Sequence, residues 1–534
     1  VRIAVDMVNE GIISHEEALL RVDAEQINQL LHRQIDTSAK LNPIAKGLPA
    51  SPGAASGKVL FSADLAEKMG EAGEKIVLVR NETAPDDIHG IIHAQGVLTA
   101  RGGMTSHAAV VARGMGKPCV CGCETIKIDM ENNLFKVNGH TIKAGDIISI
   151  DGATGNVMIG EVPMIEPTLS DEFETLLQWA NDTKTLAVRA NADTPEDAAK
   201  AKEFGAEGIG LCRTEHMFMA MERLPFVQQM ILAESMQERE EALSQLLPFQ
   251  RDDFYGILKA MAPFPVTIRL LDPPLHEFLP SRELLSLEVA ELKHNKADGQ
   301  LIWQKEELLK KIQALSENNP MLGHRGCRLG ITYPEIYRMQ VRAIFEAMIQ
   351  LTEEGVKPFA EIEIPLVMDV SELKMLKDEI MDVYNEIKAS TGVELDFAVG
   401  TMIELPRACM TADQIAKEAE FFSFGTNDLT QTTLGFSRDD AEGKYIPTYL
   451  EKRILKDNPF AVLDRTGVGE LMKLGIAKAR SVKPDLLIGI CGEHGGETSS
   501  IEFCHLAGLN YVSCSPYRIP IARLAAAQAK LKNQ

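Results

Sequence analysis

His107 stands in the stretch GGMTSHAAVVARG, directly ahead of small apolar residues whose spacing predicts a helix. A histidine there can be a packed core residue, a metal ligand, a general base or a nucleophile. Gly102 and Gly103 let the backbone approach a ligand closely, because neither carries a side chain. Thr105 and Ser106 can donate hydrogen bonds, and a helix N-terminus favours an anion. The local residues leave all four roles open.

A second group of reactive residue types follows a series of β-rich runs. The runs are TLAVRANAD, GIGLCRTE, PVTIRLLDPP, EIEIPLVMDV, FAVGTMIE, FFSFGTND, LLIGICGEHG and NYVSCSP. Near their ends stand Arg213, Thr214, Glu215, Arg269, Asp272, Glu404, Asn427, Asp428, Cys491, Gly492, Glu493 and His494. Carboxylates such as Glu404 and Asp428 suit Mg²⁺, and arginines hold carboxylate or phosphate groups. Ion pairs that merely close the end of a sheet are the alternative.

The arrangement of these runs predicts an α/β protein. Eight strands alternating with helical patterns favour a (β/α)8 barrel, with catalytic groups at the carboxyl ends of the strands. A doubly wound open sheet is the competing interpretation. We expect a helical arm or the remnant of a nucleotide-binding part over 1–44, a small α/β domain over 45–165, a helical linker over 166–184 and the barrel over 185–534. The longest insertion in the barrel spans about 274–342.

Composition narrows the class of protein. The chain has 534 residues and a formal net charge of −22, which argues against nucleic acid or an anionic membrane as the main partner. No apolar run approaches the roughly 20 residues of a membrane span. Nine scattered cysteines indicate reduced thiols and predict a cytoplasmic protein. The run CVCGC, with Cys119, Cys121 and Cys123, fits a buried strand better than a zinc site.

Several separated motifs resemble one family. They are PGAASGKV, GGMTSHAAVVARG, NADTPEDA, GIGLCRTEHMF, RLLDPPLHEF, MLGHRGCRLG, GTMIELPRA, FFSFGTNDLTQTTLGFSRDD and GICGEHGG. Together they resemble the pyruvate phosphate dikinases and, less closely, phosphoenolpyruvate synthase and the first enzyme of the bacterial sugar phosphotransferase system. The resemblance implies a small swivelling phosphohistidine domain ahead of a barrel that binds phosphoenolpyruvate and pyruvate. The implied reaction converts ATP, phosphate and pyruvate reversibly into AMP, pyrophosphate and phosphoenolpyruvate.

The resemblance also implies roles for individual residues. His107 matches the histidine that carries the phosphoryl group, and Thr105 matches a threonine that is phosphorylated for regulation in some members. Cys491 matches the acid/base at the pyruvate methyl carbon, and Glu404 and Asp428 match the Mg²⁺ ligands. The implied substrate-binding residues are Arg213, Arg269, Arg325 and Asn427, with Asp272 and Arg438 as weaker candidates.

The implied partners are pyruvate, phosphoenolpyruvate and a second copy of the chain. No G-x4-G-K-[ST] loop is present, and no G-x-G-x-x-G follows a strand. We therefore expect the nucleotide site on a missing N-terminal domain, and only the pyruvate half of the reaction here. Phosphoenolpyruvate synthase and a phosphoenolpyruvate–protein phosphotransferase are alternatives, although the stretch 48–101 is short for a carrier-binding insertion, which counts against the phosphotransferase. A non-catalytic phosphorylated regulator is the alternative of another class.

Overall fold

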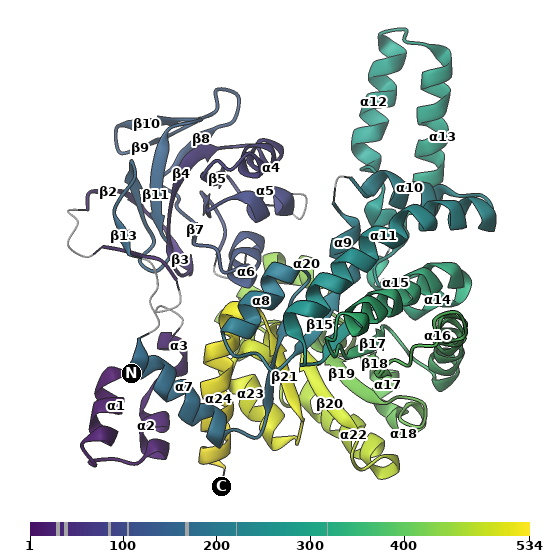
Figure 1. Ribbon diagram of the computed structural model, residues 1–534. Coiled ribbons are helices and arrows are strands. Elements are labelled where there is room, and N and C mark those ends of the chain that lie inside the picture. The colour runs from purple at the N-terminus through teal and green to yellow at the C-terminus, as the bar shows by residue number, and fades with distance from the viewer. Residues whose placement is uncertain are drawn as a thin grey trace. The chain divides into compact units, whose positions relative to one another are not determined.

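The computed structural model describes residues 1–27, 32–36, 41–83, 87–103, 106–165, 170–220, 222–317 and 319–533. The chain divides into two compact units. Unit 1 comprises Val1–Lys184, Ser437–Asn458 and Pro520–Gln534, and unit 2 comprises Thr185–Phe436 and Pro459–Ile519. Figure 1 labels their elements along the chain.

Unit 2 contains a closed barrel of eight parallel strands (Figure 1). In order around the barrel they are β14 (Ala187–Asn191), β15 (Ile209–Arg213), β16 (Val266–Arg269), β17 (Ala360–Ile364), β18 (Phe397–Ile403), β19 (Phe421–Gly425), β20 (Leu487–Cys491) and β21 (Tyr511–Cys514). The last strand, β21, pairs with the first, β14, which closes the sheet. The (β/α)8 prediction is confirmed, and the open sheet is excluded.

Helices connect the strands of the barrel. They are α8 (Pro195–Glu203), α9 (Thr214–Phe218), α10 (Leu224–Leu232), α11 (Met236–Met261), α12 (Arg282–His294), α13 (Gly299–Leu315), α14 (Cys327–Thr332), α15 (Pro334–Glu353), α16 (Val370–Thr391), α17 (Pro406–Met410), α18 (Ala412–Ile415), α19 (Thr426–Leu434), α22 (Val468–Val482) and α23 (Thr498–Leu506). The predicted insertion supplies α12 and α13, which run side by side in Figure 1. Its last part leads into α14 and brings Arg325 to the barrel, as described below.

Charged residues fill part of the barrel interior. Arg189 and Glu361 form a buried ion pair, with 2.6 Å between Nη1 and Oε2. The Thr267 hydroxyl donates to the same carboxylate at 2.6 Å. The Arg189 guanidinium lies 4.0 Å from the centroid of the Tyr511 ring. A buried charge that is paired and hydrogen-bonded avoids most of its desolvation cost, so this interior is a packed core and not a pore.

Unit 1 is built around a mixed sheet of eight strands. In sheet order they are β2 (Pro43–Lys46), β12 (Asn156–Ile159), β11 (Ile147–Asp151), β4 (Ala54–Leu60), β5 (Ile76–Arg80), β6 (Gly96–Thr99), β7 (Cys119–Cys121) and β3 (Leu48–Ser51). Strands β4 to β7 run parallel, and their connections contain α4 (Ala63–Glu71), α5 (Ile88–His93) and α6 (His107–Gly114). The small α/β domain ahead of the barrel is confirmed.

Shorter elements complete unit 1. They are α1 (Arg2–Asn9), α2 (His15–Arg21), α3 (Ala24–Ile27), β1 (Gln34–Ile35), β8 (Lys127–Asp129), β9 (Leu134–Val137), β10 (His140–Lys143), β13 (Met164–Ile165), α7 (Asp171–Thr183), α20 (Arg438–Lys444), α21 (Ile446–Glu451) and α24 (Ile519–Lys532), of which α24 begins in unit 2. Ser14 and Glu17 form a capping box at the start of α2. Among the described helices, none combines the length and the apolar character that a bilayer crossing requires.

The CVCGC run forms a buried strand, as predicted. Cys119 and Cys121 lie on β7, and these two residues and Cys123 are buried, free cysteines. The Cys119 and Cys121 sulfur atoms lie 3.4 Å apart, on the same face of the strand because they are two residues apart. The residues therefore contribute to the core of unit 1.

Candidate active site

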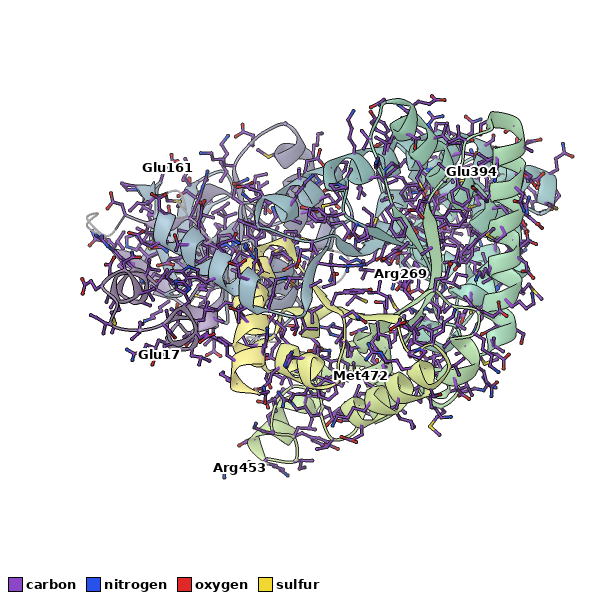
Figure 2. All side chains as sticks on the ribbon, turned by 60° about the horizontal axis from the view of Figure 1, so that its bottom comes forward. Glu17, Glu161, Arg269, Glu394, Arg453 and Met472 are labelled. Carbon is purple, nitrogen blue, oxygen red and sulfur yellow. The ribbon has the colours of Figure 1, made fainter. Side chains whose placement is uncertain are left out.

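The carboxyl edge of the barrel carries the polar residues that the sequence places there. Arg213, Arg269 and Cys491 are the last residues of β15, β16 and β20. Glu404 directly follows β18, and Asp428 is the third residue of α19, which begins directly after β19. Figure 2 labels Arg269. This edge is where (β/α)8 enzymes have their active sites.

A continuous chain of ion pairs runs along this edge. Arg269 pairs with Glu215 and, at 3.2 Å, with Asp272. Arg325 contacts Asp272 at 2.6 Å and Asp428 at 2.9 Å, both through Nη2. All of these side chains are nearly inaccessible to solvent. Arg325 comes from the insertion between β16 and β17, so residues distant in sequence form one network.

The network controls the charge of its carboxylates. Burial would raise the pKa of Asp272, but the guanidinium groups of Arg269 and Arg325 outweigh it and hold that pKa below its ordinary value. Two arginines thus share one fully ionised carboxylate. In Arg269 the Nε atom is buried and has no hydrogen-bond partner among the described residues, which leaves a donor unused. Such a donor fits an anionic ligand.

Glu404 is held by the backbone of a neighbouring loop. Its Oε1 accepts a hydrogen bond of 2.6 Å from the Leu366 N–H. Leu366 has a φ of +63°, a conformation that is strained for a leucine and is found mostly at functional sites. Burial, together with the negative charge of Asp428, raises the pKa of Glu404. The two carboxylates therefore repel each other.

Glu404 and Asp428 are two mutually repelling carboxylates and therefore suit a divalent cation. Mg²⁺ is typically bound by one or two protein carboxylates, with substrate oxygens and water completing its octahedron. The described residues form no group of three or more metal-binding side chains, so the protein would supply only part of the coordination sphere. A cation held by Glu404 and Asp428 would relieve the repulsion that helps to raise the pKa of Glu404.

Gly425 leaves room for this pair of carboxylates. A Cβ at this position would lie 2.6 Å from the Met402 sulfur and 2.8 Å from Glu404 Oε2. We expect Gly425→Ala to destabilise the barrel by about 1–3 kcal/mol, because the core must shift to accept the methyl group. Thermal unfolding measures the effect. Gly299→Ala is the control, because nothing lies within 4 Å of a Cβ at Gly299, and an equal loss there would contradict the steric argument.

Cys491 is a buried thiol at the same edge. It is 2% exposed and packs against Leu211 and Met402. The thiol donates to the Phe424 carbonyl at 3.6 Å. Burial raises the pKa of Cys491 to about 12, so the group carries its proton at neutral pH. A protonated thiol can act as a general acid.

Two residues beside Arg213 were not predicted from the sequence: Asp193, which pairs with Arg213, and His216, which contacts Asp193. Asp193 accepts from Arg213 Nη2 at 3.0 Å and from its backbone N–H at 2.7 Å. Asp193 also contacts His216 Nδ1 at 2.8 Å. Burial would raise the pKa of Asp193, but the charge of Arg213 and the bond to His216 outweigh it and lower the pKa. Asp193 follows the end of β14, so the rule of polar strand ends could have found it.

Three other candidates lie in different settings. Asn427 Nδ2 lies 3.5 Å from Asp428 Oδ1, next to the network. Arg438 belongs to unit 1, on α20, where its Nε lies 3.3 Å from Glu442 Oε2. Both ring nitrogens of His494 are engaged, at 2.7 Å from the Thr426 hydroxyl and 2.9 Å from the Pro459 carbonyl oxygen. His494 therefore connects Thr426, directly after β19, to the loop that contains Pro459.

His107 is the first residue of α6, as predicted, and Ser106 is its N-cap. The side chain of His107 lies outside the described part of the structure, and Thr105 lies outside the described residues altogether. The Ser106 hydroxyl donates to the Cys121 sulfur at 3.6 Å and does not cap the helix. Gly102 has a φ of +103°, so the turn before the helix requires glycine. The first amide groups of α6 thus lack a side-chain cap from Ser106.

Two protein families match the two parts of the chain. The PEP-utilising enzyme, PEP-binding domain matches residues 168–531, and the PEP-utilising enzyme, mobile domain matches residues 72–155. The first match covers the barrel and its strand-end network, and the second contains α6. The chain belongs to the PEP-utilising enzymes.

Within that family, the similar proteins are pyruvate, phosphate dikinases. The relative from Entamoeba histolytica is 55% identical over 100% of this chain and 60% of its own length. The relative from Clostridium symbiosum is 53% identical over 100% of this chain and 60% of its own length. The chloroplastic relative from Mesembryanthemum crystallinum is 55% identical over 99% of this chain and 55% of its own length. The chain thus spans about 60% of the length of such relatives.

Proposed function

We propose that this chain performs the reversible, Mg²⁺-dependent transfer of a phosphoryl group between His107 and pyruvate. The transfer yields phosphoenolpyruvate and is one half of the pyruvate phosphate dikinase reaction, in which ATP, phosphate and pyruvate give AMP, pyrophosphate and phosphoenolpyruvate. The observation that carries the proposal is the buried ion-pair network of Arg269, Asp272, Arg325 and Asp428, which shares the carboxyl edge of the barrel with Glu404 and the Cys491 thiol. It lies in the part of the chain that matches a PEP-binding domain.

Arginine side chains would bind the anionic groups of the substrate. Arg269 offers an unused buried Nε donor, and Arg213 is 37% exposed while Asp193 orients it. A planar guanidinium binds carboxylate or phosphoryl oxygens with two parallel hydrogen bonds. In the water-poor barrel mouth these fixed charges stabilise the negative charge of a phosphoryl group in transit. Asn427 would add an amide donor beside them.

Glu404 and Asp428 would hold the magnesium ion. The ion supplies Lewis-acid stabilisation of the oxygen that gains charge when the pyruvate methyl group loses its proton. Leu366 fixes one oxygen of Glu404, and Arg325 fixes one oxygen of Asp428, so each carboxylate is oriented before the ion binds. Such preorganisation costs little at the moment of reaction.

Cys491 would move the proton at the methyl carbon. When phosphoenolpyruvate gives up its phosphoryl group, the remaining enol carbon must gain a proton, and the buried thiol carries one. In the opposite direction the sulfur accepts a proton from the methyl group. In the first direction an S–H bond breaks and a C–H bond forms, while the phosphoryl group moves from the enol oxygen to a nitrogen of His107. In the opposite direction a C–H bond breaks and an S–H bond forms, and the phosphoryl group returns to the enol oxygen.

The remaining expectations follow from the family. We expect a homodimer and a cytoplasmic location, and a nucleotide site in the part of the relatives that this chain does not span. A phosphoenolpyruvate–protein phosphotransferase would label a small carrier protein in addition to itself. A non-catalytic regulator would need neither the carboxylate pair nor the buried, protonated thiol, which favours an enzyme.

Labelling by radioactive phosphoenolpyruvate tests the proposal. We expect the purified chain to take up an acid-labile phosphoryl group when Mg²⁺ is present and to lose the label when a chelator removes Mg²⁺. His107→Ala should abolish the label, because the motif contains no other histidine. His140→Ala is the matched control, since His140 is an exposed histidine on β10 of the same unit. Label that persists in His107→Ala would overturn the assignment.

A further inference from the structure

Several buried polar groups inside the barrel make no hydrogen bond of ordinary geometry with the described residues. They are both carboxyl oxygens of Glu363 and the hydroxyl oxygens of Ser423 and Tyr511, although Ser423 lies close to Glu363. All three side chains are completely inaccessible to solvent. A buried polar group without a hydrogen bond destabilises the folded state, so a carboxyl group in this state needs an explanation. The interior ion pair of Arg189 and Glu361 gives no such explanation, because it does not include Glu363.

Glu363 and Ser423 lie near Cys491 in the barrel interior. Glu363 is on β17 and Ser423 is on β19, and alternate strands of a (β/α)8 barrel contribute side chains to the same interior layer. On the neighbouring strand β20, Gly489 pairs with Ser423 and Cys491 pairs with Gly425. Cys491 is therefore one inward-facing position nearer the carboxyl edge than Ser423. The Ser423 hydroxyl is a neighbour of both the thiol and the carboxyl group.

The electrostatic environment agrees with this placement. Burial raises the pKa of Glu363 to about 8, the charge of Arg269 opposes the rise and that of Glu361 adds to it, so the carboxyl group exchanges its proton near neutral pH. The Ser423 hydroxyl is close enough to lower the pKa of both Glu363 and Cys491. The charged and titratable groups that face this part of the interior are Arg189, Arg269, Asp272, Glu361, Glu404, Cys491 and Tyr511.

We infer that Glu363 is a proton reserve for Cys491 and that the Ser423 hydroxyl connects the two groups. The inference rests on the proposed function of Cys491. When the Cys491 S–H gives its proton to the enol carbon, the Ser423 O–H passes its proton to the sulfur, and the Glu363 carboxyl passes its proton to the Ser423 oxygen. The thiol and the hydroxyl are restored, and the negative charge ends on Glu363. The reverse sequence removes a proton from the pyruvate methyl group.

The relay compensates for the high pKa of Cys491, which makes this residue a poor base at neutral pH. A thiolate with a pKa of about 12 is scarcely populated at neutral pH, whereas a base is most effective when its pKa is near the working pH. Concerted transfer through Ser423 gives the thiol the effective base strength of Glu363. It also moves negative charge away from Glu404 toward the interior, where the charge of Arg269 stabilises it. Glu363 is thus a positioning residue that acts through Cys491.

The exchange of labelled pyruvate into phosphoenolpyruvate tests the relay in the complete chain. We expect Glu363→Gln and Ser423→Ala each to slow this exchange about tenfold to a hundredfold, because general acid–base assistance contributes at that scale or above. First-turnover labelling of His107 by phosphoenolpyruvate should remain within about twofold of the wild type, since phosphoryl transfer precedes protonation. The double variant should be no slower than either single variant, because both changes interrupt one step.

Two readouts distinguish a relay from a structural role. The exchange rate can be measured in mixtures of light and heavy water. A plot of the wild-type rate against the deuterium fraction should be curved, because several protons move together. The same plot should be a straight line for both variants. The wild-type exchange rate should be greatest near pH 8, because pyruvate formation needs the protonated Glu363 and phosphoenolpyruvate formation needs the ionised one, and Glu363→Gln should lose this maximum. Rates and curves equal to the wild type would overturn the relay.

Two control variants and a folding measurement separate loss of the relay from loss of structure. Glu335→Gln removes a buried carboxylate on α15 that pairs with Arg239, so it reports the general effect of such a loss. Thermal unfolding checks that each variant folds, and Glu363→Met offers an apolar side chain of similar length if the glutamine variant does not fold. A wild type that neither labels His107 nor exchanges pyruvate refutes the proposed function. A wild type that does both, with unchanged variants, refutes only the relay.

Discussion

Cys491→Ser is expected to slow the exchange of pyruvate into phosphoenolpyruvate by about 100- to 10,000-fold, the range that general acid–base catalysis contributes. Serine keeps the size and the hydrogen bond, but its hydroxyl is a much weaker acid than a thiol. The sulfur packs against Leu211 and Met402 and donates to Phe424, so the variant should stay folded. First-turnover labelling of His107 should survive, because the phosphoryl group leaves before the carbon gains its proton.

Cys514→Ser is the matched control for that variant. Cys514 is also the last residue of a barrel strand, β21, it is also buried, and burial likewise raises its pKa to about 12. It has no contact with the ion-pair network among the described residues. We expect Cys514→Ser to exchange pyruvate at close to the wild-type rate. An equal loss in both variants would mean that barrel packing, and not proton transfer, accounts for the effect.

The barrel could be predicted because each of its strands is a short apolar run that ends in polar residues. That pattern predicts Arg213, Arg269 and Cys491 at strand ends, and each is the last residue of its strand. The partners of those residues were harder to predict. Asp193 was missed although it obeys the same rule, and Arg325 was suggested only by resemblance, because its insertion has no periodic signal that points to the barrel mouth.

Glu363 shows what a linear sequence hides. The run EIEIPLV alternates glutamate with isoleucine, a pattern that usually indicates a strand with one face in water. Closure of the barrel turns the glutamate face inward, so that Glu361 and Glu363 are buried. Only the pairing of β17 with both of its neighbours reveals this. The same alternation on an open antiparallel sheet would leave both carboxylates solvated.

Arg325→Met is expected to affect both activity and stability. Arg325 is the only described cation that bridges Asp272 and Asp428, and all three groups are buried. Removal of one partner from a buried ion pair costs about 3–5 kcal/mol, because the remaining charge is uncompensated. Pyruvate exchange should fall by at least about a hundredfold, since Asp428, the proposed Mg²⁺ ligand, loses its orientation and the proposed site loses a positive charge for the phosphoryl group. Thermal unfolding and the exchange assay measure the two effects.

The pH dependence of stability gives a separate test of the Arg325 network. The pKa of Asp272 is lower in the folded protein than in the unfolded chain, so its contribution to stability is complete above the unfolded value and is lost as the pH falls through the folded value. Arg325→Met should weaken that acid dependence, because one of two guanidinium groups is gone. Arg407→Met is the control, since Arg407 forms a half-exposed pair with Asp369 that should contribute about 0–1 kcal/mol. Equal destabilisation by the two substitutions would show that the buried bridge has no special role.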